Sequence, residues 1–376
     1  RVSEGLKVNS GETELQNDGY IEDLMQKLEL VIKEAMSKTF SASLGTSVGH
    51  CGAESGVGGN RRIKNGVCDP SVNVMAVKDN AGDIRACLVN YALHPTFLHA
   101  ENVLVSADYP AYIRRFLSFA QPKAIVLFAQ GTAGNQSSRY HRVGQTFEEA
   151  ARVGTTIGVE VKNCLDKMDF KDNVKISMKS DEIMPKLREY PPEEVLKTEV
   201  DKARSLFERL KSEYERGGDY IKMRNAELAL FGAENILKHS IVAKKEIKSG
   251  ELPCEIQVLA IDDTVICAMQ GEIFVEYGLE IKAFSPYKKT FVFTVTNGAL
   301  PGYVYTKEEA ETGGYEIGTS MFDAEAGIQI VNKIKEPSSI VVLDNDAVKT
   351  VCEELNALIE GFNKQIQTNN DIVGAK

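Results

Sequence analysis

A histidine stands at the end of an apolar run in the segment LVNYALHPT, residues 88–96. His94 follows residues typical of a buried strand, and a side chain just past such a strand can project into a cleft from a firmly held backbone. At neutral pH an imidazole can act as a general base, a proton shuttle or a metal ligand. Because the chain holds only five histidines, His94 is the first candidate for chemistry.

Two further side chains that could do chemistry also follow apolar, strand-like runs. Glu272 comes after EIQVLAIDDTVICAMQ, and Tyr303 comes after TFVFTVT. An imidazole, a carboxylate and a phenol, joined by one further histidine, would make a mixed site suited to zinc with one position left for water. Each of these three residues also has an interpretation without a functional role: His94 as a structural histidine, Glu272 as a carboxylate at a helix start and Tyr303 as a packing tyrosine.

Two polar loops offer additional binding groups. The loop QGTAGNQSS has glycines that allow close backbone approach, and its Asn135 or Ser137 could meet a substrate carbonyl or phosphate. It matches neither a Walker A loop nor a GxSxG elbow, and a tight strand-to-helix turn is the alternative. Arg61 and Arg62, in GGNRR, could bind an anion or a polar headgroup, or could be ordinary solvated arginines.

The elements that must position these residues are predicted from hydrophobic periodicity. Residues 18–36 have the apolar spacing of a helix with one buried face, whereas 41–66, rich in glycine and serine, predict a long loop. Two hairpins are expected, with turns at 80–83 and 262–263, and the runs AIVLFA and TFVFTVT predict two more strands. Polar residues follow four of these strands, where α/β proteins build their sites.

The region 188–248 is dense in Glu, Lys and Arg, with Leu, Ala and Ile at helical spacing and a break at Gly217–Gly218. This pattern predicts a two-helix hairpin. A solvated helical insertion is the ordinary interpretation, and a lid over the cleft or a dimer contact are the alternatives.

Composition limits the class of protein. The 376 residues are 43% hydrophobic, which predicts a folded globular protein, and the net charge is -10 with basic residues scattered among acidic ones. A nucleic-acid-binding surface is therefore not expected. No apolar run is long enough to span a bilayer. The seven cysteines are far apart and odd in number, which argues against a disulfide framework or a cysteine zinc cage.

In order along the chain, GNRR, LVNYALHPT, SADYPAY, FAQGTAGNQSSR, QGEIFVEYG and GYVYTKEEAETGGYE resemble the motifs of the neutral, non-lysosomal ceramidase family. The resemblance covers roughly residues 15–330. It implies an α/β fold of mixed β-sheets flanked by helices, with 1–376 as a single catalytic domain and the charged hairpin 188–248 inserted in it. It also implies a hydrolase of sphingolipid metabolism, a zinc-dependent amidohydrolase that cleaves ceramide to sphingosine and a fatty acid.

The resemblance assigns roles to particular residues. The zinc ligands that it implies are His94, Glu272 and Tyr303. Tyr315, in GGYE, matches a tyrosine that hydrogen-bonds the developing oxyanion. Ser137 and Arg61 fall at the family's glycine-loop serine and Asn-Arg loop, and they complete the implied catalytic set. In such a mechanism a water with a metal-lowered pKa attacks the amide carbon.

The sequence departs from the family pattern in three places. The His-x-His motif that supplies the first zinc histidine is absent, so we expect the chain to be N-terminally incomplete and, alone, to bind zinc weakly and have little activity. The family's Gly-Asp-x-Ser-Pro loop reads Gly-Asn-Gln-Ser-Ser at 134–138. Third, the charged helices 188–248 are present, whereas the C-terminal immunoglobulin-like domain of secreted ceramidases is not.

These departures keep two alternatives open. One is a related hydrolase of another N-acyl or polar amide, and the other is a degenerate, metal-free binding protein. The expected partner is a ceramide-like or other N-acyl amide substrate, with peripheral contact with lipid as an additional hypothesis and no integral membrane segment. Localisation is left open between cytoplasmic and secreted.

Overall fold

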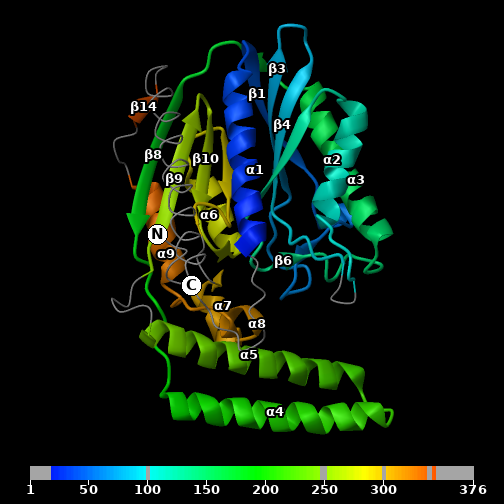
Figure 1. Ribbon diagram of the computed structural model, residues 1–376, viewed down its shortest axis with the longest axis vertical. Coiled ribbons are helices and arrows are strands. Elements are labelled where there is room, and N and C mark those ends of the chain that lie inside the picture. Colours follow the sequence, from blue (N-terminus) through cyan, green and yellow to red (C-terminus); the bar gives the residue numbers. More distant parts are fainter. Residues whose placement is uncertain (1–17, 99–101, 246–251, 299–301, 337–340, 344–376) are drawn as a thin grey trace, which may run out of the picture.

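Two five-stranded sheets form the centre of the computed structural model, which describes residues 18–98, 102–245, 252–298, 302–336 and 341–343 (Figure 1). The first sheet has the order β5-β4-β3-β1-β7, with the strands β1 (Ala42–His50), β3 (Ser71–Asp79), β4 (Ile84–Tyr91), β5 (Ile125–Gln130) and β7 (Phe170–Lys171). The second has the order β12-β10-β9-β8-β14, with β8 (Ile176–Ile183), β9 (Cys254–Ile261), β10 (Thr264–Met269), β12 (Lys289–Phe293) and β14 (Val341–Leu343). The predicted α/β class with mixed sheets is confirmed.

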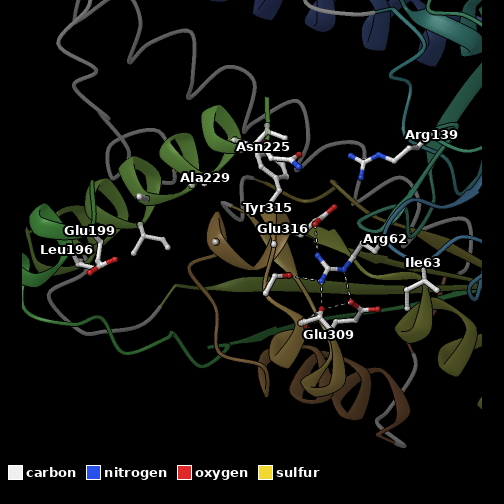
Figure 2. A pocket seen from close by; sticks show the side chains of 18 residues that line it. Arg62, Ile63, Arg139, Leu196, Glu199, Asn225, Ala229, Glu309, Tyr315 and Glu316 are labelled. Carbon is white, nitrogen blue, oxygen red and sulfur yellow. Dashed lines mark hydrogen bonds and ion pairs between the residues drawn. The ribbon is translucent and has the colours of Figure 1, made fainter. Parts of the chain in front are cut away.

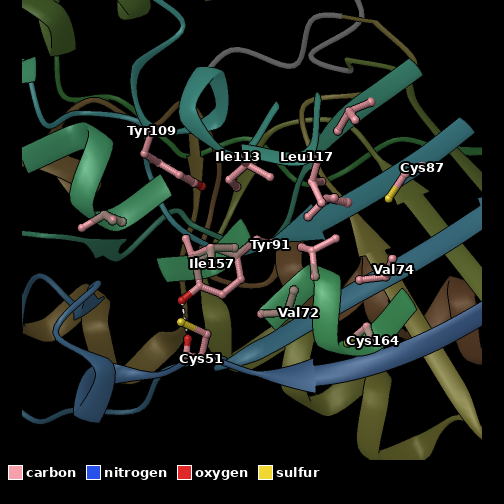
Figure 3. Packing of buried hydrophobic residues seen from close by; sticks show 14 of the residues in the cluster. Cys51, Val72, Val74, Cys87, Tyr91, Tyr109, Ile113, Leu117, Ile157 and Cys164 are labelled. Atoms are coloured by element: carbon pink, nitrogen blue, oxygen red, sulfur yellow. Dashed lines mark hydrogen bonds between the residues drawn. The ribbon is translucent and has the colours of Figure 1, made fainter. Parts of the chain in front are cut away.

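The first sheet is covered by α2 (Asp108–Ala120) and α3 (Phe147–Asp166). β3 and β4 form the predicted antiparallel hairpin, and β5 runs parallel to β4 with Tyr91 opposite Gln130. The segments that follow β4 and β5 therefore leave the sheet at the same edge. Side chains from the sheet and both helices fill one core, including Val72, Val74, Tyr91, Ile113 and Ile157 (Figure 3).

The second sheet packs against α6 (Val275–Phe284) and α9 (Ala326–Lys335). β9 and β10 form the second predicted hairpin, and β12 runs parallel to β10. Two short pairings lie at the ends of the main strands. β11 (Glu272–Ile273) is parallel to β13 (Tyr303–Val304), and β2 (Gly59–Asn60) is antiparallel to β6 (Gln136–Ser137).

A buried polar network joins the two sheets. The Asn90 amide donates to the backbone carbonyls of Ala129 (3.1 Å) and Val292 (3.0 Å), while its oxygen accepts from Asn73 (2.9 Å). Asn90 is 1% exposed, so its two donors and its acceptor all find protein partners where water cannot reach. The second sheet is thereby held against the end of β4.

Two helices occupy the charged region, α4 (Glu193–Glu215) and α5 (Tyr220–Lys245). They lie together beyond the sheets, with α5 facing α7 (Lys307–Thr312) and α8 (Tyr315–Gly318) (Figure 1). The predicted helical hairpin is confirmed, whereas its status as an insertion in a single domain stays a prediction. Among the described residues, no helix is both long and apolar enough to cross a membrane.

Two expectations from the sequence are wrong. Residues 41–66 are not one long loop, because they contain the nine-residue β1. Gly45 and Gly49 lie under the end of α3, where an added Cβ would come within 2.6 Å of Met168 and 2.5 Å of Glu160. These glycines allow a helix to pack closely on a strand. Helix α1 (Asp18–Ser37) forms as predicted, but none of its described side chains is buried.

Candidate active site

His94 is held by the glycine loop that follows β5. Its backbone N–H donates to the Gln136 carbonyl (3.2 Å), and its Nδ1 lies 2.5 Å from the Ala133 carbonyl oxygen. A carbonyl can only accept, so Nδ1 must carry the proton. The loop thus fixes both the orientation and the tautomer of the ring, as backbone carbonyls do for metal-ligating histidines.

Glu272 and Tyr303 are brought together by the short parallel pair. They are register partners on β11 and β13, so neighbouring backbones carry their side chains. Gly134 lies directly against this pair, with its N–H donating to Ile273 O (2.9 Å). A Cβ at Gly134 would lie 2.6 Å from Glu272 O, so the close approach of the loop requires glycine.

The imidazole and the carboxylate meet at this junction. His94 Nε2 lies 2.9 Å from Glu272 Oε2, and the Tyr303 ring stacks beside the imidazole with centroids 6.4 Å apart. Burial would raise the pKa of Glu272, but the contacts with His94 and Tyr303 and the Arg61 charge outweigh it, so the pKa is below its ordinary value. The three residues are therefore close neighbours, with the carboxylate ionised.

The donor set fits a cation. Because Nδ1 holds its proton on Ala133, Nε2 of a neutral ring presents a lone pair to an ionised oxygen of Glu272. Two hydrogen-bond acceptors at this distance repel each other unless a proton or a metal ion lies between them. Within the described ranges no group of three or more His, Cys, Asp or Glu side chains could hold a metal, so a metal here would also need a ligand such as the Tyr303 phenol.

Arg61 is buried and Arg62 is half-buried, and both form ion pairs, so the alternative of ordinary solvated arginines is wrong. Arg61 Nε lies 2.8 Å from Glu316 and Nη2 donates to Gly134 O (2.8 Å), while the guanidinium lies 5.4 Å from the centre of the Tyr303 ring. Arg62 pairs with Glu309 (2.6 Å) and with Glu316 (2.7 Å). Burial disfavours the Arg62 cation, but both carboxylates outweigh it and raise its pKa.

Tyr315 is the first residue of α8, directly after the segment that Arg62 holds. Arg62 Nη2 donates to Thr312 Oγ1 and to Gly313 O, both at 2.6 Å. The Tyr315 ring lies edge-on to Tyr303 (6.0 Å) and stacks on Phe231 of α5 (5.9 Å, 15° between planes). Burial and the charge of Glu272 raise the pKa of Tyr315, so it keeps its proton through neutral pH.

Ser137 occupies a different environment from the other candidates. It is 5% exposed and lies on β6, and its Oγ accepts from the Arg139 N–H (3.2 Å). It lines neither of the two cavities described below. Its neighbour Asn135 is fully buried: its Oδ1 accepts from Val275 N (2.8 Å) and its amide donates to Glu276. The polar side-chain atoms of Asn135 and Ser137 therefore form hydrogen bonds to other groups of the protein. The catalytic role of Ser137 stays a prediction.

Two cavities adjoin the row of rings formed by His94, Tyr303, Tyr315 and Phe231. A smaller one of about 350 Å³ is lined by His94, Glu272 and the glycine loop. It also contains Val295, whose φ of 58° is unusual for a β-branched residue and indicates local strain beside the site. A larger one of about 930 Å³ lies between Tyr315 and the helical hairpin (Figure 2).

Sequence reasoning missed three residues at the site: Glu309, Glu316 and Phe231. A signal for the carboxylates exists, because they stand on either side of the glycine pair in EEAETGGYE while GNRR supplies two cations far away in the chain. Phe231 gives no such signal. Its importance depends on which face of α5 meets Tyr315, and only the tertiary structure decides that.

Comparison with known proteins supports the fold. No family model matches the chain, and no curated protein matches it in sequence. Among solved structures it is similar to the neutral ceramidase from Pseudomonas aeruginosa, with 14% identity and a TM-score of 0.56 over 83% of this chain and 56% of that one. A second structure, a ceramidase complexed with C2, gives 13% identity and a TM-score of 0.55 over 83% and 57%. The chain thus shares a ceramidase-like fold and spans little more than half the length of these neighbours.

Proposed function

We propose that the protein is a zinc-dependent amidohydrolase of the neutral ceramidase type. One observation carries this proposal: His94 Nε2 and Glu272 Oε2 face each other at 2.9 Å, with the Tyr303 ring beside them. Residues that are 178 positions apart in sequence meet there as a nitrogen and oxygen set that zinc accepts. The ceramidase-like fold and the ordered motifs add independent support.

The residues around this set have distinct tasks in the proposed reaction. His94, Glu272 and Tyr303 would hold the ion, with the Ala133 carbonyl fixing the His94 tautomer. Zinc, when bound, supplies Lewis acidity toward an amide carbonyl and lowers the pKa of water. Burial raises the pKa of the Tyr303 phenol, and the Arg61 cation, 5.4 Å from the ring centre, offsets part of that rise. Tyr315 keeps its proton and can donate it in a hydrogen bond to the amide oxygen as charge develops.

The substrate of this proposal is the N-acyl amide of ceramide, released as sphingosine and a fatty acid. An N-acyl amide with a different amine part is the second candidate, because the helical hairpin forms one wall of the larger cavity and could select for another group. Ser137 would act through the shape of its loop, since its hydroxyl accepts from a backbone N–H.

Activity measurements test the proposed ligands. In the protein expressed from its complete gene and supplied with zinc, His94→Ala and Glu272→Gln should each lower kcat/KM for amide hydrolysis by about 1,000-fold or more, the scale of losing a main electrostatic contribution. Metal analysis should show less zinc in both variants. His50→Ala is the matched control, because His50 is exposed and its imidazole pairs, within the described part of the chain, with Glu54 four residues away. Undiminished turnover in either site variant would overturn the assignment.

Metal analysis also separates the enzyme from a metal-free binding protein. The proposed hydrolase should retain zinc near one equivalent after dialysis and lose activity with a chelator, with recovery on zinc addition. A binding protein would bind N-acyl amides with the same affinity before and after chelation. That second result, together with no turnover, would replace the proposal.

A further inference from the structure

The larger cavity meets the candidate site at Tyr315 and Arg62, whereas His94 and Glu272 line the smaller one, and the helical hairpin supplies its far wall. One side is the face of α5, which presents small and apolar residues: Leu228, Ala229, Gly232, Ala233 and Ile236. Tyr315 and Arg139 line the other side (Figure 2). A ligand that reaches Tyr315 from this cavity therefore lies against α5, which suits an alkyl or acyl chain.

Most charges around this cavity are already compensated inside the protein. Arg61 and Arg62 pair with Glu309 and Glu316, which makes a neutral set of two cations and two anions. The exposed Glu199 pairs with Lys202 (2.7 Å). Because these charges are already paired, they do not require a ligand of opposite charge.

Arg139 is different. In the described part of the chain, no carboxylate of the protein lies within ion-pair distance of it, and Nη1 donates to the Arg61 carbonyl at 3.2 Å. Arg139 is an exposed residue, and among the described residues that bond is the one side-chain hydrogen bond of its guanidinium, so the remaining N–H donors can bind a ligand that enters from solvent. Arg142 lies near enough for the Arg139 charge to help lower its pKa, although burial is the larger cause. Arg142 is not among the residues that line the cavity, so the uncompensated positive charge at this edge comes from Arg139.

We propose that the cavity selects substrates with an anionic group, so that, of the two proposed substrates, the N-acyl amide with a different amine part is preferred over uncharged ceramide, and a carboxylate or phosphate on that part is bound by Arg139. This inference rests on the proposed amide hydrolysis and specifies its substrate class. The planar guanidinium binds either group through two parallel hydrogen bonds. Since Arg139 and Tyr315 line one cavity, an anion bound at Arg139 and an amide oxygen at Tyr315 can belong to one molecule.

Matched substrates test this selection. N-lauroylglycine, N-lauroylethanolamine and its O-phosphate share an acyl chain and differ in charge, and the two anions separate carboxylate from phosphate recognition. The natural protein should have a kcat/KM for at least one anion that is about 10-fold or more above that for the neutral amide. Arg139→Gln should remove that ratio, Arg139→Lys should keep part of it, and the control Arg142→Gln should leave it unchanged. Equal ratios in the natural protein and Arg139→Gln would overturn the inference.

Binding measurements distinguish failure of this inference from failure of the proposed function. Calorimetry with Glu272→Gln should show the anionic amides binding about 10-fold more tightly than the neutral one, with affinity falling as salt rises. If all three amides are hydrolysed without charge preference, the hydrolase stands and the anion site is wrong. If none is hydrolysed but Arg139-dependent anion binding remains, the anion site stands and the hydrolase is wrong.

Discussion

Arg61 and Arg62 are adjacent in sequence but contact different parts of the candidate site. Arg61 reaches the glycine loop and the Tyr303 ring, whereas Arg62 reaches the loop that carries Tyr315. Glu316 forms an ion pair with each of them, at 2.8 Å from Arg61 and 2.7 Å from Arg62, and so joins the two sets. The positions of the Tyr303 and Tyr315 side chains are therefore coupled through one buried carboxylate.

Removing Arg62 should destabilise the protein strongly. Arg62→Ala leaves the buried Glu309 without its ion-pair partner and Glu316 with Arg61 alone, and losing one member of a buried ion pair costs about 3–5 kcal/mol. Arg62→Lys keeps the charge but not the forked donors, so its loss of unfolding free energy should be smaller. Urea unfolding measures both, with Arg209→Ala on α4 as an exposed control. A change below about 1 kcal/mol in Arg62→Ala would show that the pairs are not important for stability.

At the scale of elements, the sequence predicts strands whose apolar residues alternate with polar ones or form a continuous run. It does not predict elements that depend on tertiary contacts. The hairpins β3–β4 and β9–β10 and the strands β5 and β12 form where β-branched runs and turn residues predict them. β1 was missed because Gly45 and Gly49 look like loop residues until α3 is seen against them. The buried face predicted for α1 was wrong because periodicity shows which face is apolar, not whether anything covers it.

The same reasoning applies to the candidate site. His94, Glu272 and Tyr303 could be singled out because each follows a strand-like run, and the structure brings them together. Their ion-paired surroundings and the contact of Tyr315 with Phe231 depend on chain segments far apart in sequence. Ser137 was singled out by its glycine-rich loop, yet local loop geometry buries it.

Helix α5 contains a histidine whose titration should make stability depend on pH. Burial, helped by the charges of Lys238 and Arg188, lowers the pKa of His239. A histidine whose pKa is lower in the folded state binds more protons when unfolded, so stability should fall as the pH drops below about 6.5. Between pH 7.5 and pH 5, the Tm of His239→Asn should fall less than the Tm of the natural protein, by a difference of about 2 °C or more. Lys238→Gln should also reduce the loss, and identical pH profiles in all three proteins would contradict the assignment.

At the scale of the whole molecule, the candidate site lies at the junction of two halves with separate cores. His94 follows β4 of the first sheet, whereas Glu272 follows β10 of the second, and the two hydrophobic clusters share no residue. The Asn73 and Asn90 side chains, together with the bond from Thr294 N to Gln130 O (2.9 Å), connect the halves. The 2.9 Å contact between imidazole and carboxylate therefore depends on how one sheet is seated against the other.

Disturbing that junction should cost more activity than stability alone explains. Asn90→Ala leaves the Ala129 and Val292 carbonyls and the Asn73 amide without their partner, at about 1–3 kcal/mol for each unsatisfied group. Ile113→Ala, within the first core alone, should lose a comparable 2–5 kcal/mol of unfolding free energy, estimated roughly from core truncations. At a temperature where both variants are fully folded, Asn90→Ala should have the lower kcat for amide hydrolysis, because only it lets the halves shift and separates His94 from Glu272. Equal kcat values in the two variants would mean that the seating of the sheets does not control the site.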